Sequence, residues 1–425
     1  MWQKLVQVWK IRDLRKDIIF VLLMLAVFRL AAHIPIPGVD VNALRQFFRS
    51  NQILGLLNVF SGGSMENFSI VMMGVAPYIT ASIIFQLLAM IVPALEEMQK
   101  EEQGRQKINM WTRWLTVPLA AMQSFGMITL LRNSPLGILK DVTAFDLIAI
   151  VITMTAGTIF LMWIGELITE RNIGNGISLL IFAGIVAGIP RAIQQNLFNL
   201  GTSSDQLPTF LGFLVIALIT VVGVVKITEA QRNIPVQYAK QVRGNRMYGG
   251  TSTHLPLRVN MAGVIPIIFA ISVVLFPPMV AQFFVEAKTA WIANAAQWTI
   301  DIFQNQLFYG IVYFVLVFAF TYFYTEVIFH PDQIAENLQK QGGFIPGIRP
   351  GRHTSEYLAY TIHRIIFVGA LFLSVIAVLP LILKAITNTQ SLTIGGTSLL
   401  IVVAVVIETV KQIESQLTMR EYDAY

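Results

Sequence analysis

Residues 70–92 read IVMMGVAPYITASIIFQLLAMIV and contain no charged side chain. An α-helix needs about 20 consecutive apolar residues to cross the hydrocarbon core of a bilayer, so this stretch predicts a membrane span. The whole chain has a similar character, because 55% of its 425 residues are hydrophobic and only 13% are charged. An average soluble domain carries about 25% charged residues. The composition therefore excludes an ordinary soluble enzyme and a disordered chain.

Nine further stretches are apolar enough to be candidate spans. With residues 70–92 they form the set 18–34, 70–92, 115–131, 147–168, 176–193, 207–225, 259–280, 307–329, 365–383 and 397–410. The first follows several basic residues, as a secretory signal does, but Pro35-Ile36-Pro37-Gly38 stands where a small-residue cleavage site is expected. We read it as a retained span. The sequence thus predicts an all-α integral membrane protein with ten transmembrane helices.

The distribution of lysine and arginine predicts the orientation of these spans. If the N-terminus is cytoplasmic, 22 of the 30 basic residues fall on inside segments and 7 on outside segments. Basic residues are enriched in cytoplasmic loops, so both termini are expected in the cytoplasm. The net charge of +6 has the same explanation and indicates no nucleic-acid site. Two long polar loops, about 228–258 and 330–364, then face the cytoplasm, either as basic connections or as a docking platform for a partner.

A short segment before the second span is unusual. Residues 54–60, LGLLNVF, are apolar but too few to cross a membrane, and Ser61-Gly62-Gly63-Ser64 follows them. Such a segment is typical of a re-entrant element, which needs surrounding protein or a water-filled cavity at membrane depth. An interfacial helix on the outer face is the alternative.

The residues that catalysis would require are missing. There is no cysteine, no HExxH pattern among the five histidines and no phosphate-binding GxxxxGK[ST] loop. We therefore expect no catalytic residue, no metal, no cofactor and no nucleotide bound by this chain. Ion-coupled carriers place ionisable groups near the bilayer midplane, whereas Glu166, Glu326 and Glu408 lie near the predicted cytoplasmic ends of their spans. This favours a passive pore over a secondary transporter or a lipid-handling membrane enzyme, which remain the alternatives.

Aliphatic side chains occupy the middle of the spans instead. Val75 and Ile79 are four residues apart, as are Ile181 and Ile185, and this spacing places each pair on one helical face. Lipid-facing aliphatics give the same pattern, so spacing alone favours a lipid-facing stripe.

Six motifs resemble those of the SecY family, the protein-conducting channels of the general secretory pathway. They are APYITASII at 76–84, GNGIS at 174–178, THLPL at 253–257, VNMAGVIP at 259–266, FIPGIRPG at 344–351 and GGTSLLI at 395–401. They occur along the whole chain in the order found in the family. The resemblance implies two pseudo-symmetric five-helix halves, 1–195 and 205–425, with a hinge near 194–208 and a plug helix at about 54–68.

The resemblance also implies a function and partners. The chain would be the central pore subunit of a bacterial protein translocase in the cell membrane, a gated channel and not an enzyme. It would pass unfolded secretory polypeptides and release transmembrane segments sideways into lipid. The implied partners are the small membrane subunits SecE and SecG, the motor ATPase SecA, the ribosome, signal peptides with their nascent polypeptides, and membrane lipid.

Finally, the resemblance implies roles for particular residues. The pore ring would be formed by Val75, Ile79, Ile181, Ile185, Ile268 and Ile401, as a hydrophobic gasket that offers ions no substitute for their hydration. The plug would include Leu57, Asn58, Phe60, Gly62, Gly63 and Glu66. The lateral gate would include Thr80 facing Phe276, with Gln86 and Asn260 as a pair that can hydrogen-bond across it. Arg243, Arg246 and Arg349 would dock the motor or the ribosome, while Asn245 stands where many relatives have a second arginine.

Overall fold

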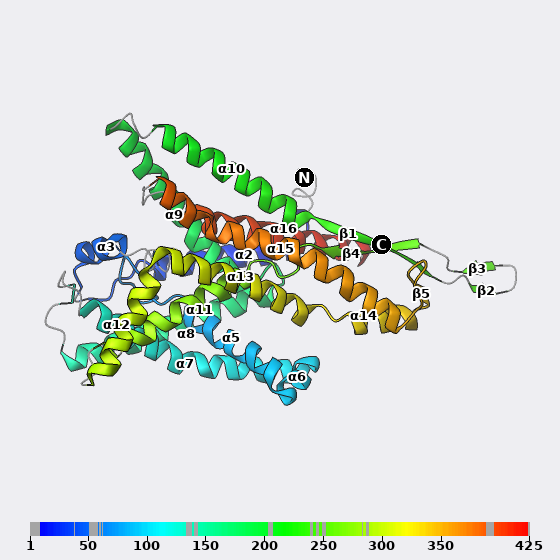
Figure 1. Ribbon diagram of the computed structural model, residues 1–425, viewed down its shortest axis with the longest axis horizontal. Helices are drawn as coiled ribbons and strands as arrows, with labels where there is room; N and C mark the ends of the chain where they lie inside the picture. Colours follow the sequence, from blue (N-terminus) through cyan, green and yellow to red (C-terminus); the bar gives the residue numbers. More distant parts are fainter. Residues whose placement is uncertain are drawn as a thin grey trace.

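Long helices run side by side along most of the molecule in the computed structural model, and a small sheet extends from one end (Figure 1). The structure describes residues 9–37, 39–50, 58, 61, 63–132, 138–139, 143–202, 207–238, 241–243, 246–248, 252–282, 284–285, 289–387 and 395–423. All structural statements below concern these residues.

Each of the ten predicted spans overlaps a long helix. The helices are α2 (Arg12–Ala31), α5 (Ala76–Ile91), α7 (Glu102–Arg132), α8 (Ala144–Glu170), α9 (Gly176–Thr202), α10 (Leu207–Glu229), α11 (Ile265–Gln282), α13 (Gln306–Ile328), α15 (Arg352–Thr387) and α16 (Gly395–Asp423). By length and apolar composition, four helices of the described chain are able to cross a membrane, or five if the bent pair α5 and α6 is one span. A count of ten spans therefore stays a prediction.

The second predicted span begins later than the hydropathy indicates. Residues 70–75 form turns, and α5 begins only at Ala76. Gly74 has a left-handed φ of 59°, which interrupts a helix, and Pro77 follows in the first turn of α5, where proline is favoured. At its other end α5 bends by 108° into α6 (Pro93–Lys100).

The expectation of an all-α chain is wrong in one region, because both long polar loops contain ordered structure. Strand β1 (Gln231–Tyr238) pairs antiparallel with β4 (Ser252–Arg258) and, at its other edge, with β5 (Gly343–Phe344). Strands β2 (Gln241–Arg243) and β3 (Arg246–Tyr248) form a second hairpin. Along β1, Ile234 and Val236 are buried and their neighbours are not, which is the alternation of a strand with one covered face.

The second polar loop is mostly helical. It contains α14 (Pro331–Lys340), and α15 begins at Arg352, well before the predicted start of its span at 365. This early part of α15 covers the sheet, since Leu358 and Ile362 share a buried cluster with Ile234, Val236 and Leu257. The loop segments are thus held to the bundle by an apolar core of their own.

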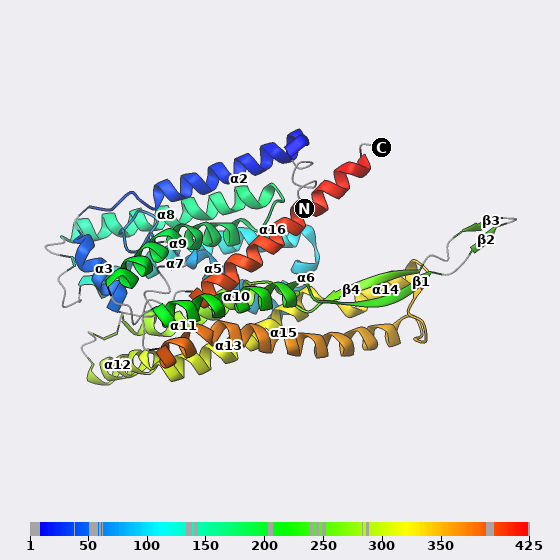
Figure 2. The same cartoon turned by 90° about the horizontal axis from the view of Figure 1, so that it is seen from above.

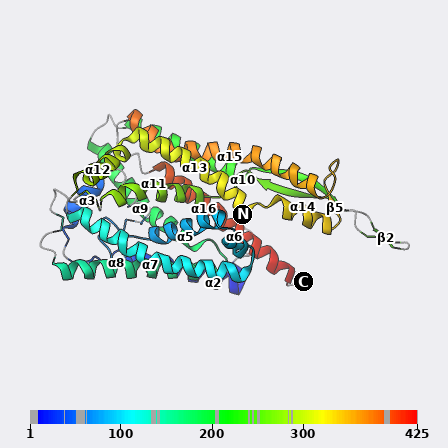
Figure 3. The ribbon, with the colours of Figure 1, turned by 60° about the horizontal axis from the view of Figure 1, so that its bottom comes forward.

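The described termini lie on the same side of the bundle. α2 begins and α16 ends toward the end that carries the strands, whereas α3 (Val41–Ser50) and α12 (Ala290–Gln304) lie at the opposite end (Figure 2). An even number of crossings requires this arrangement. Figure 3 shows α2, α5, α7 and α8 along one side and α10, α13 and α15 along the other, with α9, α11 and α16 between them.

Glycines allow the closest helix contacts. A Cβ on Gly157 of α8 would collide with the carbonyl oxygen of Ile70, and one on Gly176 would collide with the carbonyl oxygen of Gly165. A Cβ on Gly369 of α15 would lie 2.6 Å from the carbonyl oxygen of Val259. Small residues at helix interfaces let backbones approach closely within a membrane, so α8 fixes the position of the turn that precedes α5.

We predict that Gly157→Ala lowers the stability of the folded protein by about 1–3 kcal/mol, because the backbone at Ile70 must move to accept the methyl group. The midpoint of thermal unfolding in detergent measures this loss. Gly188→Ala is the matched control, since a Cβ at Gly188 meets nothing within 4 Å. Equal midpoints for the two variants would contradict the close approach of α8.

Candidate functional site

The six aliphatic residues predicted to form a ring all belong to one buried hydrophobic cluster. Their relative exposures are 6% for Val75, 8% for Ile79, 2% for Ile181, 5% for Ile185, 7% for Ile268 and 0% for Ile401. They come from α5 and the turn before it, α9, α11 and α16. A lipid-facing stripe is therefore wrong for these positions. Whether the cluster opens as a pore ring stays a prediction.

This cluster joins helices from both ends of the sequence. Ile79 and Ile181 belong to the first half of the chain, and Ile268 and Ile401 belong to the second. Side chains in such a core are held by apolar contact, which has no preferred direction. Aliphatic groups also offer no oxygen that could replace the hydration shell of an ion. The arrangement is chemically suited to a seal, not to catalysis.

The helices that carry the predicted gate residues Thr80 and Phe276 are neighbours, because α11 packs against α5 and also against α7. The predicted hydrogen bond between Gln86 and Asn260 is absent, however. The Gln86 Nε2 donates to Ser82 Oγ at 3.2 Å, and the Asn260 Nδ2 donates to the Gly263 carbonyl oxygen at 3.3 Å. The Gln86 Oε1 and the Asn260 Oδ1 are buried without a hydrogen-bond partner. Each amide thus donates within its own segment, which leaves two orphaned acceptors.

The other two predicted gate residues, Thr80 and Phe276, lie on α5 and α11. The Thr80 Oγ1 donates to the Ala76 carbonyl oxygen of its own helix at 3.0 Å. Phe276 on α11 is 37% exposed. The two residues lie on neighbouring helices, and their role as a gate remains a prediction.

Only part of the predicted plug is described, since Leu57, Phe60 and Gly62 lie outside the described residues. Asn58 accepts two hydrogen bonds from the turns that follow it. Its carbonyl oxygen accepts from the Gly63 N–H at 2.8 Å, and its Oδ1 accepts from the Glu66 N–H at 3.1 Å. The expected helix does not continue over residues 61 and 63–68, which form turns. Left-handed φ angles of 77° at Gly63 and 47° at Phe68 are incompatible with a helix there.

Ser64 holds these turns against the segment that leads into α5. Its fully buried hydroxyl lies 2.8 Å from the Ser61 carbonyl oxygen, 3.2 Å from that of Val71 and 3.4 Å from that of Met72. Around it, Met65 and Phe68 pack into an apolar cluster with residues of α3, α7 and α8. The segment is therefore surrounded by protein, as re-entrant backbone must be.

The three predicted docking arginines lie toward the end that carries the strands. Arg349 is exposed in a turn between Gly347 and Gly351, whose φ angles are 84° and 92°. The Thr354 Oγ1 donates to the Arg349 carbonyl oxygen at 2.9 Å and fixes this turn. Arg243 and Arg246 face each other in the β2–β3 hairpin, where only their backbone is described. Figure 1 shows this hairpin beyond β5.

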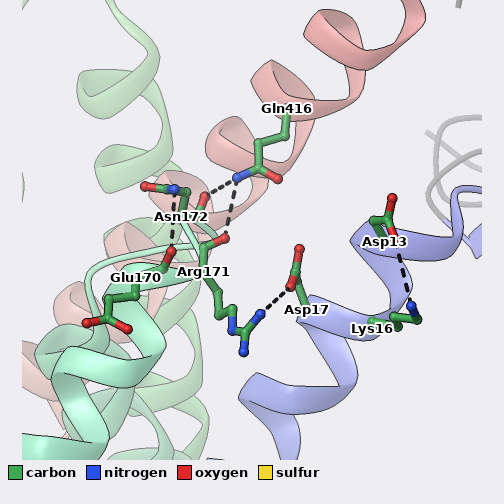
Figure 4. A network of polar contacts seen from close by, with 7 residues as sticks. All are labelled: Asp13, Lys16, Asp17, Glu170, Arg171, Asn172 and Gln416. Atoms are coloured by element: carbon green, nitrogen blue, oxygen red, sulfur yellow. Dashed lines mark hydrogen bonds and ion pairs between the residues drawn. The ribbon is translucent and has the colours of Figure 1, made fainter.

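Sequence reasoning missed a polar network at the same end of the bundle (Figure 4). The Arg171 Nη1 lies 3.4 Å from the Asp17 Oδ1, and its guanidinium lies over the Phe20 ring at 4.5 Å. The Gln416 Nε2 donates to the Asn172 carbonyl oxygen at 2.7 Å. This network connects α2, the turn after α8 and α16. A single arginine in a short segment between two predicted spans was the only signal in the sequence, and it does not reveal a partner 245 residues away.

Comparison with known proteins identifies the family. The model of the SecY family matches residues 69–410. The chain belongs to the SecY family. It is 45% identical over 438 residues to the protein translocase subunit SecY of Halalkalibacterium halodurans, covering 100% of both chains. The SecY of Streptomyces galbus is 45% identical over 432 residues, covering 97% of both chains. With its apolar helices, this SecY-family chain is a multi-pass membrane protein.

Solved structures share the SecY-type fold. One, described as showing that the plug domain of SecY stabilises the closed state, aligns with a TM-score of 0.61 at 16% identity, covering 93% of this chain and 91% of that one. Sec61 of the canine ribosome-channel complex aligns with a TM-score of 0.55 at 15% identity, covering 93% and 91%. The arrangement of the helices is therefore that of the SecY and Sec61 channels.

We predict that Ser64→Ala loosens the turns before α5, because it removes the buried hydroxyl that lies 2.8 Å from the Ser61 carbonyl oxygen and near those of Val71 and Met72. A lost buried hydrogen bond costs about 1–3 kcal/mol, so exchange of the Gly63 and Ser69 amide hydrogens should accelerate by about fivefold or more. Thr129→Ala, which removes a bond within α7 only, is the control. Unchanged exchange at both amides would show that Ser64 does not hold the segment.

Proposed function

We propose that this chain is the central pore subunit of a protein translocase, with ten spans and both termini in the cytoplasm. It would pass unfolded secretory polypeptides across the cell membrane and release transmembrane segments sideways into lipid. One observation carries the proposal beyond family membership. The six aliphatic residues of the predicted ring come from four separate places in the chain and are all buried in one cluster.

In this proposal the six residues form the constriction, and the segment around Asn58 and Ser64 blocks it from outside. Opening requires the two halves, about 1–195 and 205–425, to separate where α11 meets α5 and α7. Polypeptide side chains would then replace the contacts that the aliphatic residues lose. No covalent step takes place on this chain, so energy must come from a partner.

The proposed partners are the ribosome and the motor ATPase SecA at the cytoplasmic end, and the small subunits SecE and SecG in the membrane. Two related channels were solved in ribosome complexes, canine Sec61 and yeast Ssh1, which supports a ribosome partner here. The exposed Arg349 and the hairpin of Arg243 and Arg246 extend from the same end. Basic side chains at such positions suit an acidic surface or RNA phosphate.

Ile401→Asn should relax the selection of substrates. The variant places an amide in the buried cluster, where it favours water, and it removes apolar burial worth about 1.5–3 kcal/mol. That energy is comparable with the gap between two states of a gate, so the open state should gain population by tenfold or more. Export of a reporter with a defective signal sequence, normalised to channel abundance, measures the change.

The matched control is Val406→Asn on the same helix, because Val406 is 42% exposed. It should lower insertion or abundance without relaxing selection. If Ile401→Asn keeps normal abundance and normal stringency, Ile401 does not belong to the ring.

Arg349→Glu should abolish motor-driven translocation while the protein still inserts and folds, since the side chain is exposed and the turn is held through backbone groups. Translocation into reconstituted vesicles, with motor and ATP supplied, is the measurement. Arg352→Glu reverses the same charge three residues later, where Arg352 pairs with Glu356 on its own helix at 3.0 Å. It should retain most activity. Equal loss in both variants would indicate a general charge effect and not a specific contact.

A further inference from the structure

Helix α12, at the end of the bundle opposite the strands, presents three different faces. One face packs on the protein: Ala296 is 5% exposed, and the ring of Phe303 lies 5.4 Å from that of Phe308 in an edge-on contact. A second face is polar, where the Gln297 Nε2 donates to the Asp301 Oδ1 at 3.1 Å. The helix therefore has a protein side and a water side, and a third side remains.

The third face consists of tryptophan. Trp291 is 77% exposed and Trp298 is 66% exposed. They are seven residues apart, so they lie on the same side of the helix, and the exposed Ala295 lies between them. Two large indole rings on one side of a helix, beside a polar side, are typical of a helix in the membrane interface.

The neighbouring surface indicates what covers these rings. Helix α13 begins two residues after α12 ends and is among the helices long and apolar enough to cross a membrane. Its exposed side chains Leu307, Ile311 and Val315 recur every four residues, with exposures of 72%, 56% and 55%. An exposed aliphatic stripe on a membrane-crossing helix is suited to contact with lipid, and the edge-on contact of Phe303 with Phe308 joins α12 to the start of that stripe.

The chemistry of α12 also favours lipid over a protein partner. Asp301 is the only charged residue in the helix and belongs to the polar face. Tryptophan is enriched at the level of the lipid headgroups, where its ring is buried while the indole N–H stays hydrated. The face of Trp291 and Trp298 thus has the composition of a headgroup contact.

We propose that α12 is an interfacial membrane anchor. It lies in the headgroup region of the leaflet on the side opposite the strands, with Trp291 and Trp298 in lipid and Asp301 in water. Because α11 packs against α12, the anchor fixes the outer end of α11, the helix that carries Ile268 and Phe276. The anchoring itself requires only that the chain spans a membrane, whereas its effect on α11 as a gate rests on the proposed function.

Accessibility of single labels tests the anchor directly. The chain has no cysteine, so Ala295→Cys and Gln297→Cys can each carry one nitroxide label in the full chain while both tryptophans remain. In vesicles of phosphatidylethanolamine and phosphatidylglycerol, collision with oxygen reports lipid, and collision with a water-soluble nickel chelate reports water. The ratio of oxygen to nickel accessibility should be several-fold higher at position 295 than at position 297.

Two results would overturn the anchor. Equal ratios, with both labels open to nickel, would mean that α12 stands in water. A label at 295 shielded from both reagents would mean that a protein chain, not lipid, covers the tryptophan face.

A second comparison tests the link to α11. The double variant Trp291→Ala with Trp298→Ala should raise export of a signal-defective reporter several-fold, while Trp291→Tyr with Trp298→Tyr, which preserves interfacial rings, should match the parent. Normal stringency in the alanine variant would refute the link if Ile401→Asn relaxes selection in the same assay. If neither variant relaxes selection, both the ring role of Ile401 and the link from α12 to α11 fail, and the labelling result still decides the anchor.

Discussion

Satisfaction of backbone hydrogen bonds at membrane depth is the constraint on which the rest of this structure depends. Where no water is present, each peptide N–H and C=O needs a partner within the protein, and long helices provide one for nearly every group. Among the described residues, the turns over residues 63–75 are one exception. They are tolerated because Asn58 and Ser64 supply side-chain partners and because α3, α7 and α8 surround them. The irregular segment is possible only inside the bundle that it helps to close.

The position of the aliphatic cluster follows from this closure. Gly157 lets α8 reach the backbone at Ile70, which fixes the turns that end at Val75 and therefore the point where α5 begins. Val75 and Ile79 then meet Ile181 of α9 within one core. A larger residue at position 157 would shift the start of α5 and, with it, two members of the cluster. The seal proposed for this protein thus depends on a glycine outside it.

Hydropathy was sufficient to locate the ten long helices, because each overlaps an apolar stretch of several helical turns. It could not locate the polar part of α15 before residue 365, which is helical because it covers the sheet with Leu358 and Ile362. Spacing placed Val75 and Ile79 on one face but could not distinguish a buried face from a lipid-facing one. The resemblance to the SecY family favoured the buried face, and the low exposure of both side chains agrees with it. The pairing of Gln86 with Asn260 failed because it depends on side-chain rotamers, which a sequence does not reveal.

The absence of a hydrogen bond between Gln86 and Asn260 affects the free-energy difference between the closed and open states of the proposed gate. In the proposed gate, the two buried oxygens without partners would cost about 1–3 kcal/mol each, and hydration on opening would remove this cost. Burial of each aliphatic side chain contributes about 1.5–3 kcal/mol in the opposite direction. The closed state is then held by apolar contact, which the side chains of an entering polypeptide can replace. A specific hydrogen bond across the gate would first have to be broken, and few substrates could supply its equivalent. Closure by contact without such a bond therefore suits a channel that must open for polypeptides of many sequences.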